Sequence, residues 1–349
     1  MQAKPSSTPP FSVTKPLPRF STVSVGGRYI SYLVDLVVVG CINTLVLALF
    51  HISPILFEAS FLYFQGVEKL IDLPSSDVMI TLISFVTFAT IYFFAEAFLN
   101  ISIGKRLMGQ HLVMLKGFNT PRRHFLGALE RAIIKAVPPV AVIDGLFILK
   151  SRRLGQRLTD AHNGFVVVEK RKPFWWNFIS ISAILYYFPL ATITLRSCFI
   201  FSSQPSSAPS NATAITGNLL SQIAVNNLGL SLQLLLGGIT LSLLSVLIIF
   251  SSSLIEGIVL GSIFREQSSF ILHYVLPHFF FETAGYVLMV CGSVIISMLI
   301  LDWIEGYIKK KSLKSLVNSL GERSRNLLIS STIAAVLILL GAMIEASLA

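Results

Sequence analysis

Three ionisable residues in the second half of the chain lie in apolar surroundings, where their chemistry has the largest consequences. His278 and Glu282 are four residues apart and directly follow Pro277, in HYVLPHFFFETAG at 273–285. A helix that begins at this proline places both side chains on one face, within contact distance. Glu256 lies in the preceding apolar run. Ionisable groups at membrane depth are typical of a polar cavity that carries ions or protons.

Other interpretations of the His278 and Glu282 pair stay open, and the first is a hydrogen-bonded pair that only stabilises the fold. We expect no metal site, because His-x-x-x-Glu supplies half of a ligand set and no second His-rich helix accompanies it. The sequence has no Gly-x-Ser-x-Gly, no Gly-rich loop ending in Gly-Lys-Ser/Thr and no His-Glu-x-x-His. We therefore expect no enzymatic activity, no catalytic residues and no cofactor.

The first half carries an intramembrane carboxylate of its own, Asp35. Arg28 lies seven residues earlier on nearly the same helix face, but two turns, about 10 Å, separate the two residues along the axis. A carboxylate near the middle of a helix costs about 2.5–3.5 kcal/mol on insertion scales. Asp35 therefore either pairs with Arg28 or with a cation among Arg152, Arg153 and Arg157, or handles ions or protons itself.

The elements that must position these residues are apolar runs. Only 13% of the residues are charged, against roughly 25% in soluble domains, and the mean hydropathy is +0.75. A crossing helix needs about 20 mainly apolar residues. Six segments meet or nearly meet this length: Tyr29 to Phe50, Val78 to Leu99, Phe174 to Leu195, Leu228 to Phe250, Ala284 to Leu301 and Leu327 to Ser347. We predict an all-α, polytopic transmembrane helical bundle.

Two further apolar stretches contain residues that lipid does not accept easily. Residues 132–149 contain Lys135 and the Pro138-Pro139 pair, so we interpret them as an interfacial or re-entrant element. Residues 254–281 are divided by Arg265-Glu266 and by Pro277 into pieces too short to span alone. The predicted bundle thus has about six full spans, one broken crossing and one interfacial element.

The distribution of basic residues predicts the orientation in the cell membrane. Residues 104–173 contain 14 of the 27 Lys and Arg against four acidic residues. By the positive-inside rule this stretch is cytoplasmic, which puts the N-terminus inside, residues 56–77 and 201–216 outside, 309–325 inside and the C-terminus outside. Its expected partners are anionic lipid head groups, with partner membrane proteins or a second copy of the chain. In this membrane context we expect no nucleic-acid binding.

Four ordered motifs in residues 24–170 resemble the RDD family of membrane proteins. They are Arg28 and Asp35 in GGRYISYLVDL, the Gly104-Lys105 to Gly109 segment in SIGKRLMGQHLVML, and Asp160 in RRLGQRLTDAHNGFVVVE. The sequence departs from the family pattern in AHNG, after Asp160. The resemblance implies a transport role, with Arg28, Asp35 and Asp160 as its marked residues.

Residues 174–349 carry a second resemblance, to the stage II sporulation protein M family. The matching features are Asn226 and Asn227 in AVNNLGLSL, the run IEGIVLG, the Leu-Pro-His-x-x-x-Glu segment that contains His278 and Glu282, and the late acid Glu345 in GAMIEA. The resemblance implies a membrane scaffold for envelope-remodelling proteins, without carrying over the process of sporulation.

The sequence therefore predicts a disordered Pro/Ser/Thr-rich cytoplasmic tail at 1–23, an RDD-like module at 24–172 and a second membrane module at 173–349. The second module holds a polar cluster of Asn226, Asn227, Glu256, His278 and Glu282. We expect a transport or channel component for ions or small solutes. The alternative is a scaffold or assembly factor that transports nothing.

Overall fold

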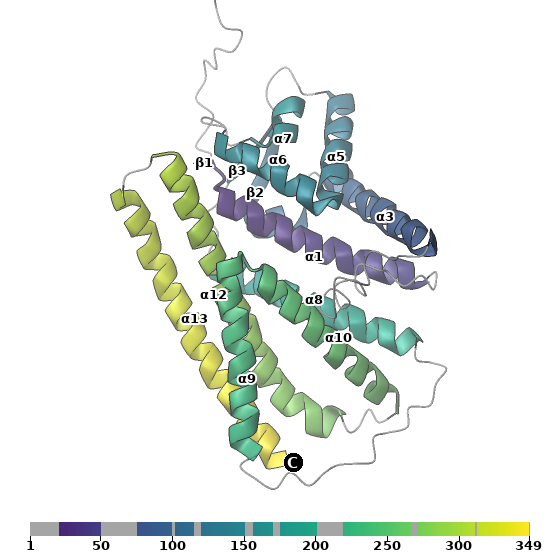
Figure 1. The fold of residues 1–349 in the computed structure, drawn as a ribbon, viewed down its shortest axis with the longest axis vertical. Coiled ribbons are helices and arrows are strands. Elements are labelled where there is room, and N and C mark those ends of the chain that lie inside the picture. The colour runs from purple at the N-terminus through teal and green to yellow at the C-terminus, as the bar shows by residue number, and fades with distance from the viewer. Residues whose placement is uncertain are drawn as a thin grey trace, which may run out of the picture.

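The computed structural model describes residues 21–49, 75–99, 102–114, 120–150, 156–169, 175–200, 219–266, 271–310 and 313–348. The predicted loop at 201–216, most of the predicted loop at 56–77 and most of the predicted tail lie outside these residues. Within them the chain is a bundle of helices with one small sheet (Figure 1). The predicted all-α polytopic bundle is thereby confirmed.

The first part of the described chain combines two long helices with short ones. Its helices are α1 (Val25–Leu49), α3 (Ser75–Leu99), α4 (Ile103–Leu107), α5 (Pro121–Ala136), α6 (Pro138–Lys150) and α7 (Leu158–Asn163). Strands β1 (Ser21–Thr22), β2 (Gln110–Met114) and β3 (Phe165–Glu169) form an antiparallel sheet in the order β1-β3-β2. β1 uses two residues of the predicted tail, because their backbone pairs with the end of β3.

The second part consists of long apolar helices. They are α8 (Trp175–Ile200), α9 (Leu219–Leu236), α10 (Leu243–Glu266), α12 (Leu276–Ile308) and α13 (Leu313–Leu348), with the 3₁₀ turn η3 (Gly237–Thr240) and the π-helical turn η4 (Ile271–Val275). Among the residues that the structure describes, six helices are long and apolar enough to cross a membrane, namely α1, α8, α9, α10, α12 and α13. The part of α3 with described side chains, residues 82–98, is apolar as well.

One predicted span is wrong: residues 228–250 are two helices and not one. The chain turns at η3, and Leu241 and Ser242 follow with left-handed φ angles of 56° and 63°. Gly237 makes the turn possible, since a Cβ on it would lie 2.1 Å from Ser245 Oγ. Hydroxyl groups bond across the turn, with Ser242 Oγ 2.6 Å from Ser297 Oγ. Averaged hydropathy misses this turn because its residues are apolar or small.

The predicted broken crossing at 254–281 is also wrong. α10 continues to Glu266. Pro277 lies in the first turn of α12, where backbone N–H groups have no partner within the helix, so a proline there costs no hydrogen bond. The stretch is therefore the end of one span and the start of the next. With the turn after α9, residues 228–281 thus contribute to α9, α10 and α12, three of the helices long and apolar enough to cross a membrane.

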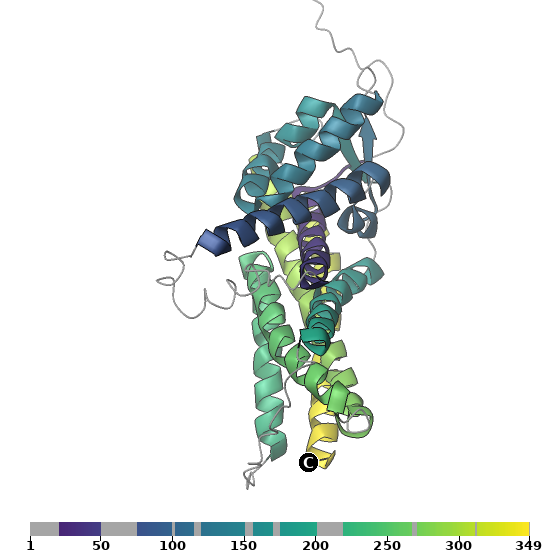
Figure 2. The same cartoon turned by 90° about the vertical axis from the view of Figure 1, so that its right-hand side faces the viewer.

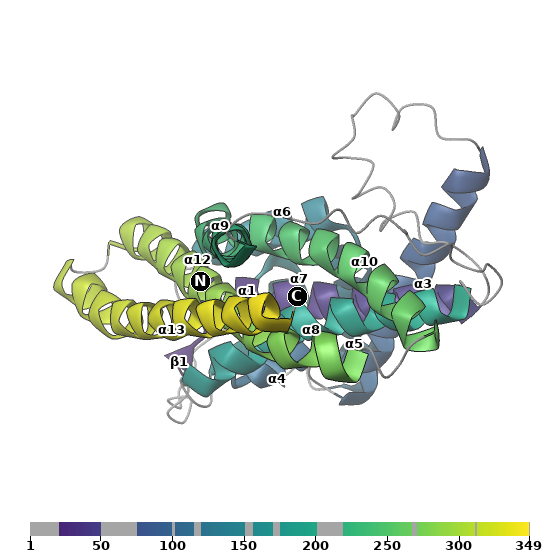
Figure 3. The same cartoon turned by 90° about the horizontal axis from the view of Figure 1, so that it is seen from below.

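The two predicted modules share one hydrophobic core. Val34 and Val38 of α1 pack in the same cluster as Ile181 of α8 and Val294 of α12. Polar contacts join the modules as well: the first backbone N–H of α1, at Val25, donates to Glu305 Oε2 of α12 at 2.8 Å. In Figures 1 and 2, α5, α7 and the sheet gather at one end and the C-terminus lies at the other. Figure 3 shows α10 running beside α8, the helix it packs against.

Candidate functional site

Arg28 and Asp160 form a buried ion pair that links α1 to α7. Arg28 Nη1 donates to Asp160 Oδ2 at 3.2 Å, and Nη2 donates to the backbone oxygen of Val167 at 3.3 Å. Both side chains are almost completely buried. Two of the three residues marked by the RDD resemblance therefore contact each other, across more than 130 residues of sequence.

Asp35 has a different partner from those expected. Its Oδ1 accepts from the backbone N–H of Gly104 at 2.8 Å, and its Oδ2 accepts from the hydroxyl of Tyr92 at 2.9 Å. The cation closest to it is Lys135 of α5, with Nζ 3.6 Å from Oδ2. Asp35 thus pairs neither with Arg28 nor with Arg157, and Arg152 and Arg153 lie outside the described residues. The sequence could not single out Lys135 because a helix pairing sets this contact.

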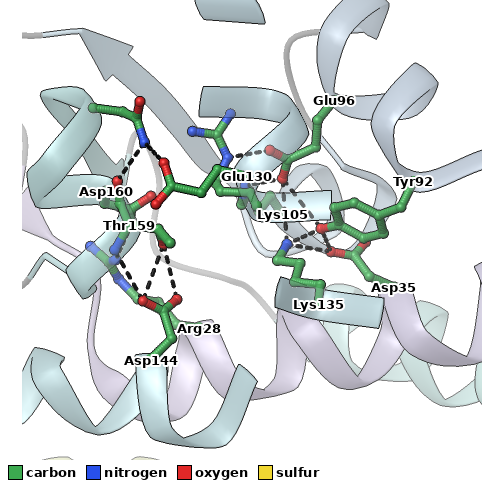
Figure 4. Close-up of polar contacts among 12 residues, drawn as sticks. Arg28, Asp35, Tyr92, Glu96, Lys105, Glu130, Lys135, Asp144, Thr159 and Asp160 are labelled. Atoms are coloured by element: carbon green, nitrogen blue, oxygen red, sulfur yellow. Dashed lines mark hydrogen bonds and ion pairs between the residues drawn. The ribbon is translucent and has the colours of Figure 1, made fainter. Parts of the chain in front are cut away.

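Glu96 of α3 joins Asp35 in one buried network, drawn in Figure 4. Lys105 Nζ lies 2.6 Å from Glu96 Oε1, and Lys135 Nζ lies 3.4 Å from the same oxygen. Arg131 Nε donates to Glu96 Oε2. The Arg131 guanidinium also covers the ring of Phe165, 4.3 Å from its centroid, a favourable cation–π geometry.

The acids of this network are all paired with cations. The two carboxylates, Asp35 and Glu96, face three cations, Lys105, Arg131 and Lys135. Each carboxylate has a cation within 4 Å and a hydroxyl or N–H donor as well. Buried charges arranged in this way fix the positions of α1, α3, α4 and α5 relative to one another. They leave no carboxylate free to take up an ion.

α5 and α6 each bury charged side chains and expose apolar ones. α5 buries Arg131 and Lys135 but exposes Phe125, Leu129 and Ile133. α6 does the same: Asp144 is buried, where it accepts from the Thr159 N–H and hydroxyl, and α6 exposes apolar side chains, Val140, Ile143, Leu146 and Phe147. Contiguous apolar faces of this kind are uncommon against water, so we expect this pair of helices to contact lipid. The expectation of an interfacial element at 132–149 agrees with this arrangement.

A cysteine at Leu129 or Leu146 is therefore expected to resist a water-soluble maleimide in membranes and to react after denaturation in SDS, because lipid covers it. The background would lack Cys41, Cys198 and Cys291. Arg122→Cys, at an exposed position on the same hairpin, is the matched control and is expected to react in open membranes. Equal labelling at all three positions would show that water, and not lipid, covers the α5–α6 face.

The second module brings three helices together around Glu282. Asn227 Nδ2 of α9 donates to Glu282 Oε1 at 2.6 Å. His278 and Glu282 of α12 meet Glu345 of α13, and one ligand atom from each lies within 4.8 Å of the others. We call His278, Glu282 and Glu345 the His–Glu–Glu cluster. Glu345 is the residue that the predicted cluster lacked.

Gly341 explains how α13 comes close enough to contribute Glu345. A Cβ at this position would lie 2.5 Å from Glu282 Cγ and 3.3 Å from the backbone oxygen of His278. Glu345 follows one turn later and so projects from the same face of α13. The glycine and the acid together form the α13 side of the cluster.

The remaining predicted residues lie outside the His–Glu–Glu cluster. Glu256 is half-buried on α10 and is not among the three residues of the cluster. Asn226 is exposed and donates to Asn227 Oδ1 at 3.4 Å, so it contacts the residue that holds Glu282.

Two further acids of α12, Asp302 and Glu305, lie at the end of the helix far from the cluster. About 23 residues of helix separate Glu305 from Glu282, which corresponds to about 35 Å. Asp302 pairs with Arg323 at 2.6 Å and Glu305 with Lys309 at 2.9 Å. These two acids therefore serve the contact between α1, α12 and α13, and not the cluster.

Six crossing helices around a shared apolar core, with charged groups buried between them, define a multi-pass membrane protein. Residues 172–349 match the family of stage II sporulation protein M. Because the match covers more than half of the 349 residues, the chain belongs to this family. No curated protein and no solved structure matches the chain. The resemblance of residues 24–170 to the RDD family stays a prediction.

Proposed function

We propose that this protein handles cations, as a transport or channel component, through the His–Glu–Glu cluster of its second module. The observation that carries the proposal is a contrast between the two modules. Each acid of the buried network in the first module has a cation beside it, whereas the cluster brings two carboxyl groups together without one. Among the described residues, no ion pair joins Glu282 or Glu345 to a Lys or Arg.

Two carboxylates this close in half-buried surroundings repel each other strongly and do not both stay ionised without a compensating charge. The cluster therefore takes up either a proton or a metal cation. By the distribution of basic residues, the α5–α7 end of the molecule faces the cytoplasm and the cluster lies toward the extracytoplasmic side. The proposed site is thus open to cations from outside the cell.

The RDD-like first module has a supporting role in this proposal. Arg28, Asp35 and Asp160 are the marked residues of that resemblance, and all three are already paired with groups of the protein. Asp35 is therefore not one of the ion-carrying residues in this proposal. The paired charges hold α1 in place, and α1 packs against α8 and α12 of the second module.

Purified protein in liposomes is expected to pass protons or metal cations down an imposed gradient, measured with dyes inside the vesicles. Glu282→Gln should reduce this flux at least about 10-fold, because the neutral amide removes the charge that attracts the cation. Glu130→Gln is the matched control: Glu130 bonds to His162 and Asn163 on the cytoplasmic end, far from the cluster. Equal flux in the wild type and Glu282→Gln would contradict the proposal.

A second candidate function is a scaffold that transports nothing, and the paired charges of the first module together with the exposed apolar face of α5 and α6 favour it. In this case the basic cytoplasmic segment binds anionic lipids or a partner protein, with about 1 kcal/mol for each cation near the membrane surface. Reversing Arg122 and Arg123 to Glu would then remove partners from crosslinked, co-purified complexes. An unchanged set of partners, together with cation flux, would exclude the scaffold.

A further inference from the structure

We infer that the His–Glu–Glu cluster is a binding site for a divalent transition-metal ion of the zinc or manganese class. This inference rests on the proposed function, since it names the cation that the same site takes up. It departs from the expectation that the second module has no metal site. That expectation considered only His278 and Glu282, whereas the fold adds a third ligand from α13.

The ligand atoms are nearly close enough for a shared ion. Metal–ligand distances of about 2.0–2.2 Å at a tetrahedral ion place the ligand atoms roughly 3.5 Å from one another. In the structure they lie within 4.8 Å, so closing the site needs shifts of about 1 Å. Side-chain torsions of the two glutamates can supply such a shift without moving α12 or α13.

The type of ligand selects the type of metal. One imidazole with two carboxylates favours zinc, manganese or iron over magnesium and calcium, which prefer oxygen ligands alone. His278 Nδ1 is buried and has no hydrogen-bond partner among the described residues. A buried imidazole nitrogen without a donor or acceptor is costly, and an ion at the cluster offers a partner for the imidazole.

Asn227 acts as the outer-shell residue of this site. Its amide donates to Glu282 Oε1, which holds the carboxylate in place. Three protein ligands leave at least one position for water, as in sites that exchange their ligands and unlike closed structural zinc sites. The site therefore suits an ion that arrives and leaves.

Zn²⁺ binding to the purified full-length protein tests this inference directly. The protein would be stripped with a chelator in detergent and dialysed against Zn²⁺, and the bound metal would be counted by mass spectrometry. We expect one high-affinity Zn²⁺ per chain. His278→Gln, Glu282→Gln and Glu345→Gln should each weaken binding more than about 10-fold, and Asn227→Ala about 10-fold, as for loss of an outer-shell partner.

Controls separate loss of the site from loss of the fold. Glu130→Gln should bind Zn²⁺ like the wild type, and each variant should elute as the same species on size exclusion with a similar melting temperature. Should one ligand variant fail to fold, the other two and Asn227→Ala still decide the result. Absence of stoichiometric Zn²⁺ binding, or binding that persists in all three ligand variants, would overturn the metal site.

The outcomes also distinguish this inference from the proposed function. Zinc binding without flux in liposomes would retain the metal site and contradict transport. Proton flux that Glu282→Gln abolishes, in protein that binds no Zn²⁺, would retain cation handling and overturn the metal site. Absence of both flux and binding would contradict both proposals.

Discussion

Glu96→Gln is expected to destabilise the protein by about 3–5 kcal/mol, the cost of breaking a buried ion pair by removing one partner. Glu96 contacts Lys105, Arg131 and Lys135, and all of these side chains are almost completely buried. With the wild-type charges the network sums to one excess positive charge, and the substitution raises this to two. The remaining cations cannot reach water without separating α3, α4 and α5.

The expected loss can be measured as the midpoint of unfolding in mixed SDS and detergent micelles. Glu130→Gln is again the matched control, because Glu130 pairs with an exposed His162 and such pairs contribute about 1 kcal/mol or less. The double variant Glu96→Gln/Lys105→Met restores the excess charge to one and should recover part of the stability. A Glu96→Gln midpoint equal to that of Glu130→Gln would show that the network carries little stability.

Gly104→Ala is expected to have an effect of comparable size, about 3 kcal/mol or more, by overpacking and by loss of a charged hydrogen bond. A Cβ on Gly104 would lie 2.0 Å from the backbone oxygen of Ser31 and 2.8 Å from its carbonyl carbon. Backbone atoms of α1 cannot move aside as a flexible side chain can. α4 must therefore shift, and the Gly104 N–H then loses Asp35 Oδ1, now 2.8 Å away.

Gly40→Ala on α1 is the matched control, since no atom lies within 4 Å of the added Cβ. Alanine in a helix interior is favoured over glycine by about 0.5–1 kcal/mol, so this variant should be neutral or slightly more stable. Thermal melting followed by size exclusion would compare the two variants. A Gly104→Ala protein as stable as Gly40→Ala would refute the close approach of α4 to α1.

Both modules place acids between helices, but the groups that face these acids differ. In the first module, Lys105, Arg131 and Lys135 come from helices beside α3 and neutralise its acid. In the second, the facing helices supply Asn227 and another acid, Glu345. The first arrangement favours a rigid support and the second favours a site for an exchangeable cation. This difference between the modules underlies both proposals.

The hydropathy pattern predicted a crossing helix correctly wherever the length of an apolar run was enough to identify it. Residues 29–50, 174–195, 284–301 and 327–347 all lie in or almost entirely within crossing helices. The error at 228–250 occurred where the chain turns within apolar sequence, and the error at 254–281 occurred where one helix ends and the next begins. Lipid and protein interior are equally apolar, so hydropathy does not distinguish a continuous span from two spans joined by a Gly-Gly turn.

The sequence by itself determined the membrane class, the family of residues 172–349 and that Asp35 would need a partner. It also determined that His278 and Glu282 share a helix face, because i, i+4 spacing is local. Only the tertiary structure decided that Asp35 meets Lys135 and that Glu345 completes the cluster. Those contacts depend on which helices pack together, and the packing of near-uniform apolar surfaces is set by small residues such as Gly104 and Gly341, whose effect no local pattern reveals.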